Sequence, residues 1–523
     1  MRAGVIIFNR FGDLCQATPL IKSLYEQGYE VHLFIKPLLM FFAQNIPWID
    51  SLWPIMDDAS GVVEVLNDQG FDVLVNLTAV EEAASLAGRI KSKVKYGPFI
   101  DSGDSLVVNG EWATYFLCVP YDKKHNMFHI SDLFLDMGGG KRPTSLPTIL
   151  PYFPLDKQFP IEKGAVGLQL GASDEGRMWP IVNYIELASC LIDDGRQIVL
   201  LGDRSEEYLS HAFFDGLDNK YKDRVVDTVG SVPLHVLPRI IEALDVVVGP
   251  DTGTIHLAAC MGKRVVSFFL GPAYYWATGP YGENNVVLQP DIECYPCEYH
   301  YKCTTGRCQK SITPDDVIES GFRIGAGENI TCDVFVSYFD SYGYLRYVPA
   351  YVNRSRPITP ATLVQFVAHH LWYFELAKEP VDSMDKMMKI SRLLDSGPVP
   401  PDFEEIVDEY LYMLPLIADS MKEATTLIME MHDNPEFLEI GYMELLKVNG
   451  QIANIERNAV TTCNTVRFIE ISRKHMVEDD LFKIMEKYFF LYSLGEDMLR
   501  SIYSICIGIA REIVRRRNVI SND

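Results

Sequence analysis

The chain has 523 residues, which is too long for a single hydrophobic core and suggests about three domains. Hydrophobic residues make up 48% and charged residues 23%, as in ordinary globular proteins. The formal net charge of -24 excludes a general nucleic-acid binder, because such a protein carries a basic stripe. An anionic ligand must therefore be held locally, by helix termini and a few cations.

The chain starts with a short apolar run, GVIIFN at residues 4–9, which predicts a buried strand. The run is too short for a secretion signal or a membrane span, and no later stretch holds about 18 apolar residues. Most of the eleven cysteines are isolated in apolar contexts that indicate core packing, for example Cys118, Cys190, Cys260 and Cys506. We therefore expect a cytoplasmic protein that spans no membrane.

The first third alternates strands with helices. Residues 18–28 (TPLIKSLYEQG) predict a helix, and residues 29–35 and 71–78 predict further strands. This alternation is typical of a parallel sheet with crossover helices. Residues 141–163 carry five prolines and no periodicity, which indicates a linker. We place a first Rossmann-like domain at 1–150, which we expect to bind the acceptor.

The pattern restarts after the linker, and we place a second Rossmann-like domain at 160–324. Its predicted strands are AVGLQLG (165–171), RQIVLLGD (196–203), DVVVGPD (245–251) and RVVSFFLG (264–271). The expected class is α/β, with two such domains facing a cleft. Ligands of such sheets bind beyond the carboxyl ends of the strands, so the glycine-rich strand ends should face this cleft.

The character changes after residue 325. Residues 325–357 predict a β-hairpin that turns at 341–343, and residues 358–523 predict an α-helical module with breaks at 395–402 and 432–435. This module suits oligomerisation or docking of an acceptor. A basic cluster near its end either complements a helix dipole or lies on an anionic membrane surface, at the inner face. Its members are Arg511, Arg515, Arg516 and Arg517.

The stretch GPDTGTIHLAACMG at 249–262 runs from a strand end directly into a helix. Gly249 and Gly253 let the backbone approach a ligand closely. Thr252 or Thr254 can cap a helix that begins near residue 255, whose positive end suits a phosphate or diphosphate.

Two further side chains of this stretch bear on a ligand. His256 lies on the first helical turn. Asp251 would repel phosphate and is better suited to a sugar hydroxyl or a backbone amide. The alternative is a well-capped helix start with a buried histidine.

Two other strand ends of the second domain carry candidate ligand groups. Ser173 and Arg177 follow Gly171, and the planar guanidinium suits a bidentate phosphate contact. Glu206 or Glu207 follows a glycine turn, where a carboxylate suits ribose hydroxyls. The alternative for each is a solvated loop charge.

Four cysteines lie close together in the sequence, in the pattern C-x2-C-x5-C-x4-C. They are Cys294, Cys297, Cys303 and Cys308. This grouping in a cytosolic chain favours a structural zinc or iron site, as an insert at 294–308 that braces the cleft wall. The alternatives are reduced thiols or two local disulfides.

Three motifs, at residues 10–28, 171–191 and 246–282, resemble glycosyltransferase family 9 in order and spacing. These ADP-heptose heptosyltransferase-like proteins have two Rossmann-like domains in the GT-B arrangement, and the resemblance covers roughly residues 1–320. It implies that Asp13 is the general base, and the alternative for this residue is a helix N-cap. It implies that the donor is held by Ser173 and Arg177 at its phosphates, Glu206 at its ribose, and Asp251, Thr252, Gly253, Thr254 and His256 at its sugar and phosphates.

Two positions depart from the family pattern. Met178 stands where a second cation can precede Trp-Pro, and Ala273 replaces the usual threonine, which leaves the donor identity open.

The resemblance implies an inverting transferase without a catalytic metal. It would move a sugar, with heptose as a candidate, from a nucleotide-diphosphate donor to a hydroxyl of a glycan, lipid-linked or protein acceptor. The alternatives are a sugar-nucleotide epimerase and a binding scaffold that lacks transfer activity.

Overall fold

The computed structural model forms two units, residues 1–95 with 128–353 and residues 96–127 with 354–523. It describes residues 1–8, 10–56, 60–67, 70–121, 126, 128–143, 149, 160–292, 294–297, 303–323, 330–339, 343–351, 402–434, 438–456 and 481–520, and single residues between 363 and 472. Most of the expected linker, residues 144–148 and 150–159, lies outside this description.

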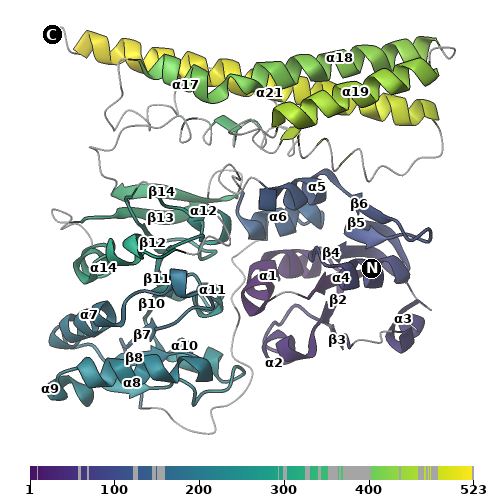
Figure 1. The fold of residues 1–523 in the computed structure, drawn as a ribbon. Helices are drawn as coiled ribbons and strands as arrows, with labels where there is room; N and C mark the ends of the chain where they lie inside the picture. Colours follow the sequence, from purple (N-terminus) through teal and green to yellow (C-terminus); the bar gives the residue numbers. More distant parts are fainter. Residues whose placement is uncertain are drawn as a thin grey trace. The chain divides into compact units, whose positions relative to one another are not determined.

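The N-terminal part of the first unit is a parallel sheet in the order β3-β2-β1-β4 (Figure 1). Its strands are β1 (Arg2–Ile7), β2 (Glu30–Ile35), β3 (Ser51–Pro54) and β4 (Phe71–Asn76). The central strand β1 is buried almost throughout, as expected where helices cover both faces of a parallel sheet. The helices of this part are α1 (Phe11–Glu26), α2 (Met40–Ala43), α3 (Ser60–Asn67), α4 (Glu81–Arg89) and α6 (Ile130–Met137).

The rest of the first unit is an eight-stranded sheet in the order β14-β13-β12-β11-β10-β7-β8-β9. Its strands are β7 (Val166–Gln169), β8 (Ile198–Leu201), β9 (Val225–Asp227), β10 (Val246–Pro250), β11 (Arg264–Phe268), β12 (Val286–Gln289), β13 (Asp333–Phe339) and β14 (Leu345–Tyr351). Six strands are parallel, and β13 and β14 are antiparallel. The expected hairpin is therefore present, but it extends this sheet instead of forming a separate element.

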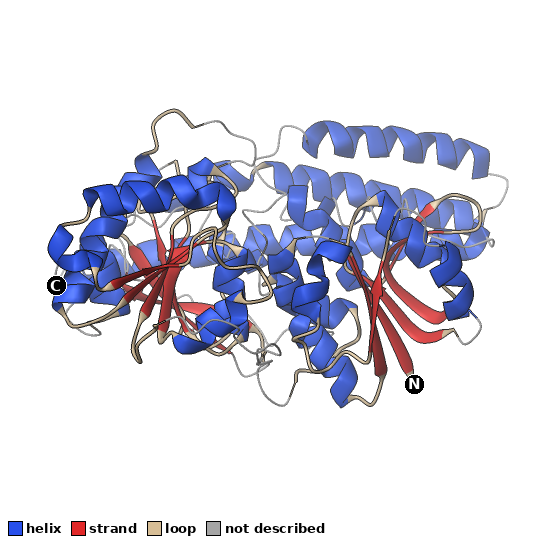
Figure 2. Cartoon of the chain, turned by 90° about the horizontal axis from the view of Figure 1, so that it is seen from below, coloured by secondary structure: helices blue, strands red, loops and turns tan. Residues whose placement is uncertain are grey.

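Figure 2 shows helices on both faces of the eight-stranded sheet. The strands of the two sheets form separate groups in this view. The helices around the second sheet are α7 (Ile181–Asp193), α8 (Glu207–Gly216), α9 (Asn219–Lys222), α10 (Leu237–Ala243), α11 (Gly253–Cys260), α12 (Tyr275–Thr278), α13 (Arg307–Lys310) and α14 (Pro314–Gly321). An aromatic cluster anchors the segment after β7. The Trp179 ring lies 4.9 Å from both the Tyr184 and Phe268 rings, between centroids.

The second unit combines a short strand pair with long helices. Its described elements are β5 (Ser92–Ile100), which starts in the first unit, β6 (Leu106–Asn109), α5 (Glu111–Cys118), α17 (Phe403–Leu411), α18 (Met413–Asp433), α19 (Leu438–Glu456) and α21 (Leu481–Ile520). Helix α18 ends at Asp433, within the break predicted at 432–435, and α19 begins at Leu438. Arg511 pairs with Glu404 of α17, whereas the side chains of Arg515, Arg516 and Arg517 lie outside the description.

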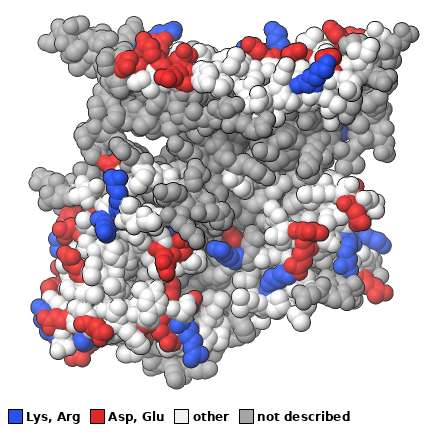
Figure 3. Space-filling view, viewed as in Figure 1, with Lys and Arg blue, Asp and Glu red and all other residues white. Residues whose placement is uncertain are grey.

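The expected α/β class with two Rossmann-like sheets, a hairpin and a helical C-terminal region is confirmed, whereas the domain boundaries stay predictions. Acidic and basic side chains are interspersed over the described parts of the face in Figure 3. In the described part of the chain, no helix combines the length and apolar character that a membrane span requires.

Candidate active site

A cavity of about 430 Å³ lies at the carboxyl ends of strands from both sheets of the first unit. Small-molecule sites in proteins occupy roughly 300–1,000 Å³. Every residue expected at the donor site, together with Asp13, lines this cavity. The lining comprises Arg10, Phe11, Gly12, Asp13, Gln16, Gln169, Ala172, Ser173, Arg177, Gly202, Asp203, Glu206, Thr228, Val232, Leu234, Leu237, Asp251, Thr252, Gly253, Thr254, His256 and Thr278.

Two glycines let the first turns of α1 and α11 meet at this cavity. A Cβ atom on Gly12 would lie 2.9 Å from Cδ2 of His256, and one on Gly253 would lie 2.7 Å from Cδ1 of Phe11. Both distances are shorter than real Cβ contacts, so any side chain here would push the helices apart. The close approach brings Asp13, on the first turn of α1, to the same cavity as the start of α11.

The start of α11 leaves polar groups unused. The helix begins at Gly253, two residues earlier than predicted, with Thr252 at the N-cap position and no side-chain capping bond. The Oγ1 atom of Thr252 and the Nδ1 atom of His256 are buried and have no hydrogen-bond partner within the described residues. Buried polar atoms normally find partners, so these groups and the first N–H groups of the helix are suited to an anionic ligand.

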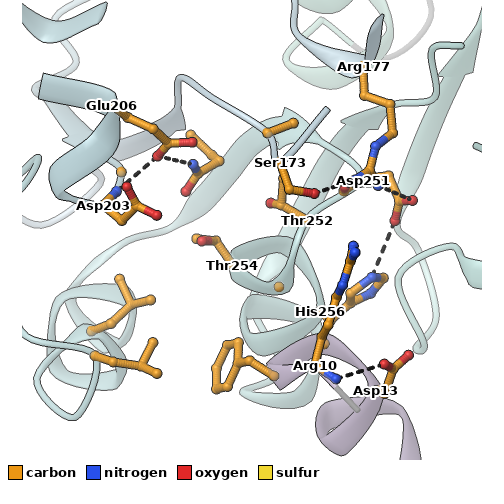
Figure 4. A pocket seen from close by; sticks show the side chains of 18 of the residues that line it. Arg10, Asp13, Ser173, Arg177, Asp203, Glu206, Asp251, Thr252, Thr254 and His256 are labelled. Atoms are coloured by element: carbon orange, nitrogen blue, oxygen red, sulfur yellow. Dashed lines mark hydrogen bonds and ion pairs between the residues drawn. The ribbon is translucent and has the colours of Figure 1, made fainter. Parts of the chain in front are cut away.

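Arg177, Asp251 and His256 form one network on the wall of the second sheet (Figure 4). Arg177 donates from Nη2 to Oγ of Ser173 over 2.7 Å, and from Nη1 to the carbonyl oxygen of Asp251 over 3.1 Å. The Asp251 carboxylate lies 3.4 Å from this guanidinium and 3.3 Å from Nε2 of His256. The Asp251 carboxylate is therefore paired with side chains of the same wall, and it neutralises part of the Arg177 charge.

Glu206 lies at the far end of the same wall, in a 3₁₀ turn (Arg204–Glu206) after β8. Its Oε2 accepts hydrogen bonds from the backbone N–H of Asp203 over 2.9 Å and from Nε2 of Gln169 over 3.2 Å. A Cβ atom on Gly171 would lie 2.0 Å from Oε1, so only glycine leaves room for this carboxylate. Burial raises the pKa of Glu206. Hydrogen bonds from Asp203 and Gln169 therefore hold the Glu206 carboxylate in place.

Asp13 occupies the third position of α1, where its Oδ2 accepts a hydrogen bond from the backbone N–H of Arg10 over 3.0 Å. This contact gives the residue a capping role, which leaves the capping alternative open beside the expected role as a base. Burial raises the pKa of Asp13, against the lowering effects of that N–H and of the nearby charges of His256 and Arg10. A carboxylate that is partly desolvated in this way is a better proton acceptor than a solvated one.

The cysteine segment braces this wall, but it does not form a metal site in the described residues. Gln309 of α13 donates to the carbonyl oxygens of Glu175 and Met178, over 2.6 and 2.9 Å, on either side of Arg177. The four thiols are close enough to influence one another electrostatically. However, no three described His, Cys, Asp or Glu side chains converge on a point that could hold a metal ion. Cys303 instead accepts a hydrogen bond from the Gly306 N–H.

Sequence reasoning missed part of the cavity lining. Arg10 and Gln16 of the first sheet's wall, and Gln169 and Asp203 of the second, were not predicted to take part. Arg10 had a signal, since it is a cation three residues before the candidate base. Gln169 had a weaker one, as a polar side chain at the end of an apolar strand. Met178 and Ala273, the two departures from the family pattern, do not line the cavity.

The chain is similar to known sugar transferases over part of its length. Residues 141–307 match the family model of glycosyltransferase family 9 (heptosyltransferase). Lipopolysaccharide heptosyltransferase 2 of Escherichia coli is 27% identical over 137 residues, which are 26% of this chain and 38% of that protein. Lipopolysaccharide heptosyltransferase 1 of the same species is 23% identical over 249 residues, which are 46% of this chain and 73% of that protein.

Among solved structures, that of ADP-heptose lipopolysaccharide heptosyltransferase II of E. coli aligns with a TM-score of 0.48 at 18% identity. The alignment covers 61% of this chain and 97% of that one. The resemblance to a heptosyltransferase-like family, predicted from the three motifs, is confirmed over residues 141–307, which contain the second and third motifs.

Proposed function

We propose that this chain, which resembles glycosyltransferase family 9 over residues 141–307, transfers a sugar from a nucleotide-diphosphate donor to a hydroxyl group of an acceptor. One observation carries the proposal. Asp13, a partly desolvated carboxylate of the first sheet's wall, lines the same cavity as the unused polar groups at the start of α11. Heptose is the proposed sugar, because the matching family model is described by heptosyltransferases.

The donor would lie along the wall of the second sheet. Its diphosphate would meet the first N–H groups of α11, the Thr252 hydroxyl and the Ser173–Arg177 pair. Its ribose would bond the Glu206 carboxylate, which Gln169 and Asp203 already orient. These groups are set before the reaction starts, so little free energy is lost in arranging them around the leaving group.

In the reaction, the acceptor oxygen forms a bond to the anomeric carbon while the bond from that carbon to the diphosphate oxygen breaks. Asp13 takes the proton of the acceptor hydroxyl, and the nucleoside diphosphate leaves with the bonding electron pair. Attack from the side opposite the leaving group inverts the anomeric centre. Arg177 and the positive end of α11 stabilise the charge of the leaving group, so the mechanism requires no catalytic metal.

The acceptor is a glycan, a lipid-linked sugar or a protein. We assign acceptor docking or self-association to the helices of residues 358–523. We assign the protein to the cytoplasm, with the inner face of the membrane as the alternative.

Isothermal titration calorimetry with ADP, UDP and GDP tests the donor site. We expect binding of at least one of them and weaker binding by His256→Ala, because His256 contacts the Asp251 carboxylate beside the proposed diphosphate site. The matched control is His211→Ala, which removes an exposed histidine of α8. Absence of binding by all three nucleotides would refute the proposal.

A structural zinc or iron ion at Cys294, Cys297, Cys303 and Cys308 stays a prediction. It would require these thiols to move into a tetrahedral arrangement. Elemental analysis of protein never exposed to chelator should find about one metal ion per chain. Less than about half an equivalent of zinc plus iron would leave the four residues as free thiols.

A further inference from the structure

The cavity carries more negative than positive side chains, although the proposed donor is an anion. Its described lining holds the carboxylates of Asp13, Asp203, Glu206 and Asp251, against the guanidinium groups of Arg10 and Arg177. A diphosphate in this cavity would meet repulsion from Asp13 and Asp251 unless enough cationic charge faces it. The position of each arginine therefore decides whether the site can accept a diphosphate.

Arg177 can supply only part of the cationic charge that a bound diphosphate requires. Its Nη1 donates to the carbonyl oxygen of Asp251 and lies 3.4 Å from the Asp251 carboxylate, and its Nη2 donates to Ser173. The next residue, Met178, has no charge. Among the described residues that line the cavity, the wall of the second sheet thus presents Arg177 as its arginine, and Arg177 is already paired with Asp251.

Arg10 lies on the opposite wall and is differently placed. It is the N-cap residue of α1, and its side chain is exposed within the cavity lining. Figure 4 shows this side chain extending beside His256 toward the Asp251 end of the cavity. Within the described residues, its guanidinium has no hydrogen bond and no ion pair at 4.0 Å or less. Its charge lowers the pKa of Asp13 at longer range.

We propose that Arg10 is a donor-binding residue that contacts the diphosphate from the first sheet's wall, in addition to Arg177. This inference rests on the proposed function. A planar guanidinium with five N–H donors can bond two phosphate oxygens at once. The contact would link the donor to both walls of the cavity, and it would place a positive charge beside the leaving group and close to Asp13.

The test compares Arg10→Gln with the parent in calorimetry, using the best-bound of ADP, UDP and GDP and its nucleoside. The loss of charge-assisted hydrogen bonds should weaken nucleoside diphosphate binding roughly 10- to 100-fold. Binding of the nucleoside, which has no phosphate, should be unchanged. Arg10→Lys should restore part of the diphosphate affinity, because it returns the charge without the planar fork.

The matched control is Arg323→Gln, which removes a half-exposed arginine outside the cavity lining and should leave both affinities unchanged. Diphosphate affinity of Arg10→Gln within about twofold of the parent would overturn the inference while leaving the proposed function intact. An unchanged diphosphate affinity with a raised KM for the acceptor would also overturn it, by assigning Arg10 to the acceptor. If the parent binds none of the three nucleotides, the proposed function itself fails.

Discussion

The two walls of the cavity differ in how far their polar groups are satisfied. On the wall of the second sheet, Arg177, Asp251 and His256 contact one another, and Glu206 is held by Gln169 and Asp203. On the wall of the first sheet, Asp13 accepts one backbone hydrogen bond and the Arg10 side chain has no hydrogen bond among the described residues. One wall is prearranged, whereas the other keeps charged groups available.

This difference fits separate roles for the two walls, in which the second sheet's wall holds the donor and Asp13 of the first sheet's wall accepts the proton. Groups that hold a donor in one orientation work best when neighbouring side chains fix them. A group that accepts a proton must instead keep an unused lone pair that can reach the substrate. Changes at Asp13 should therefore affect the rate of transfer, whereas changes at Arg10 and in the second sheet's wall should affect the affinity for the donor.

The largest expected effect is that of Asp13→Asn. Asn retains the size and capping ability of Asp but cannot act as a base, so transfer should fall roughly 100- to 10,000-fold. Nucleotide binding measured by calorimetry should persist, and the melting temperature should stay within a few degrees. Asp218→Asn is the matched control, since Asp218 caps α9 without lining the cavity. Transfer above about a tenth of the parental rate would reduce Asp13 to a capping residue.

A smaller effect, on affinity, is expected of Gly171→Ala in the prearranged wall. The added Cβ would lie 2.0 Å from Oε1 of Glu206 and must displace that carboxylate. Loss of a hydrogen bond to a charged group should weaken nucleoside binding roughly tenfold or more. Gly61→Ala, whose added Cβ meets nothing within 4 Å, is the control for the same substitution. Equal nucleoside affinity in both variants would remove Glu206 from the donor site.

The smallest expected effect is a displacement in the pH dependence of transfer. Because burial raises the pKa of Asp13, this carboxyl group should become protonated, and lose its function as a base, at a higher pH than an ordinary aspartate, whose pKa is about 3.9. The acid limb of kcat/KM should lie above that value. Asp13 should also contribute stability that is present below its unfolded pKa and lost as the pH rises through its folded pKa.

Two measurements check this prediction. A pH profile of kcat/KM locates the acid limb, and melting curves of the parent and Asp13→Asn at several pH values report the stability contribution. An acid limb at or below the ordinary aspartate pKa would contradict the assignment of Asp13 as a desolvated base.

The class of the fold and most of the site could be predicted because their signals are local. Buried parallel strands leave continuous apolar runs such as VVV at 246–248, and this run is followed by glycines and polar residues that line the cavity. The pairing of β12 with β13 could not be predicted, because it joins segments more than 40 residues apart. Sequence alone also could not show that Asp251 contacts Arg177, or that Gln309 donates to the carbonyl oxygens on either side of Arg177, because these residues are far apart in the sequence.

The placement of the β13–β14 hairpin bears on where the chain can be cut. Truncation near residue 320, where the resemblance inferred from the motifs is expected to end, would leave β12 as a bare edge strand with unpaired N–H and C=O groups. It would also deprive the fully buried Asp132 of the hydrogen bond from the Leu345 N–H, so that, among the described residues, Arg142 and Tyr281 would remain as donors to its carboxylate. A fragment with both sheets should therefore retain residues through Tyr351 to avoid aggregation.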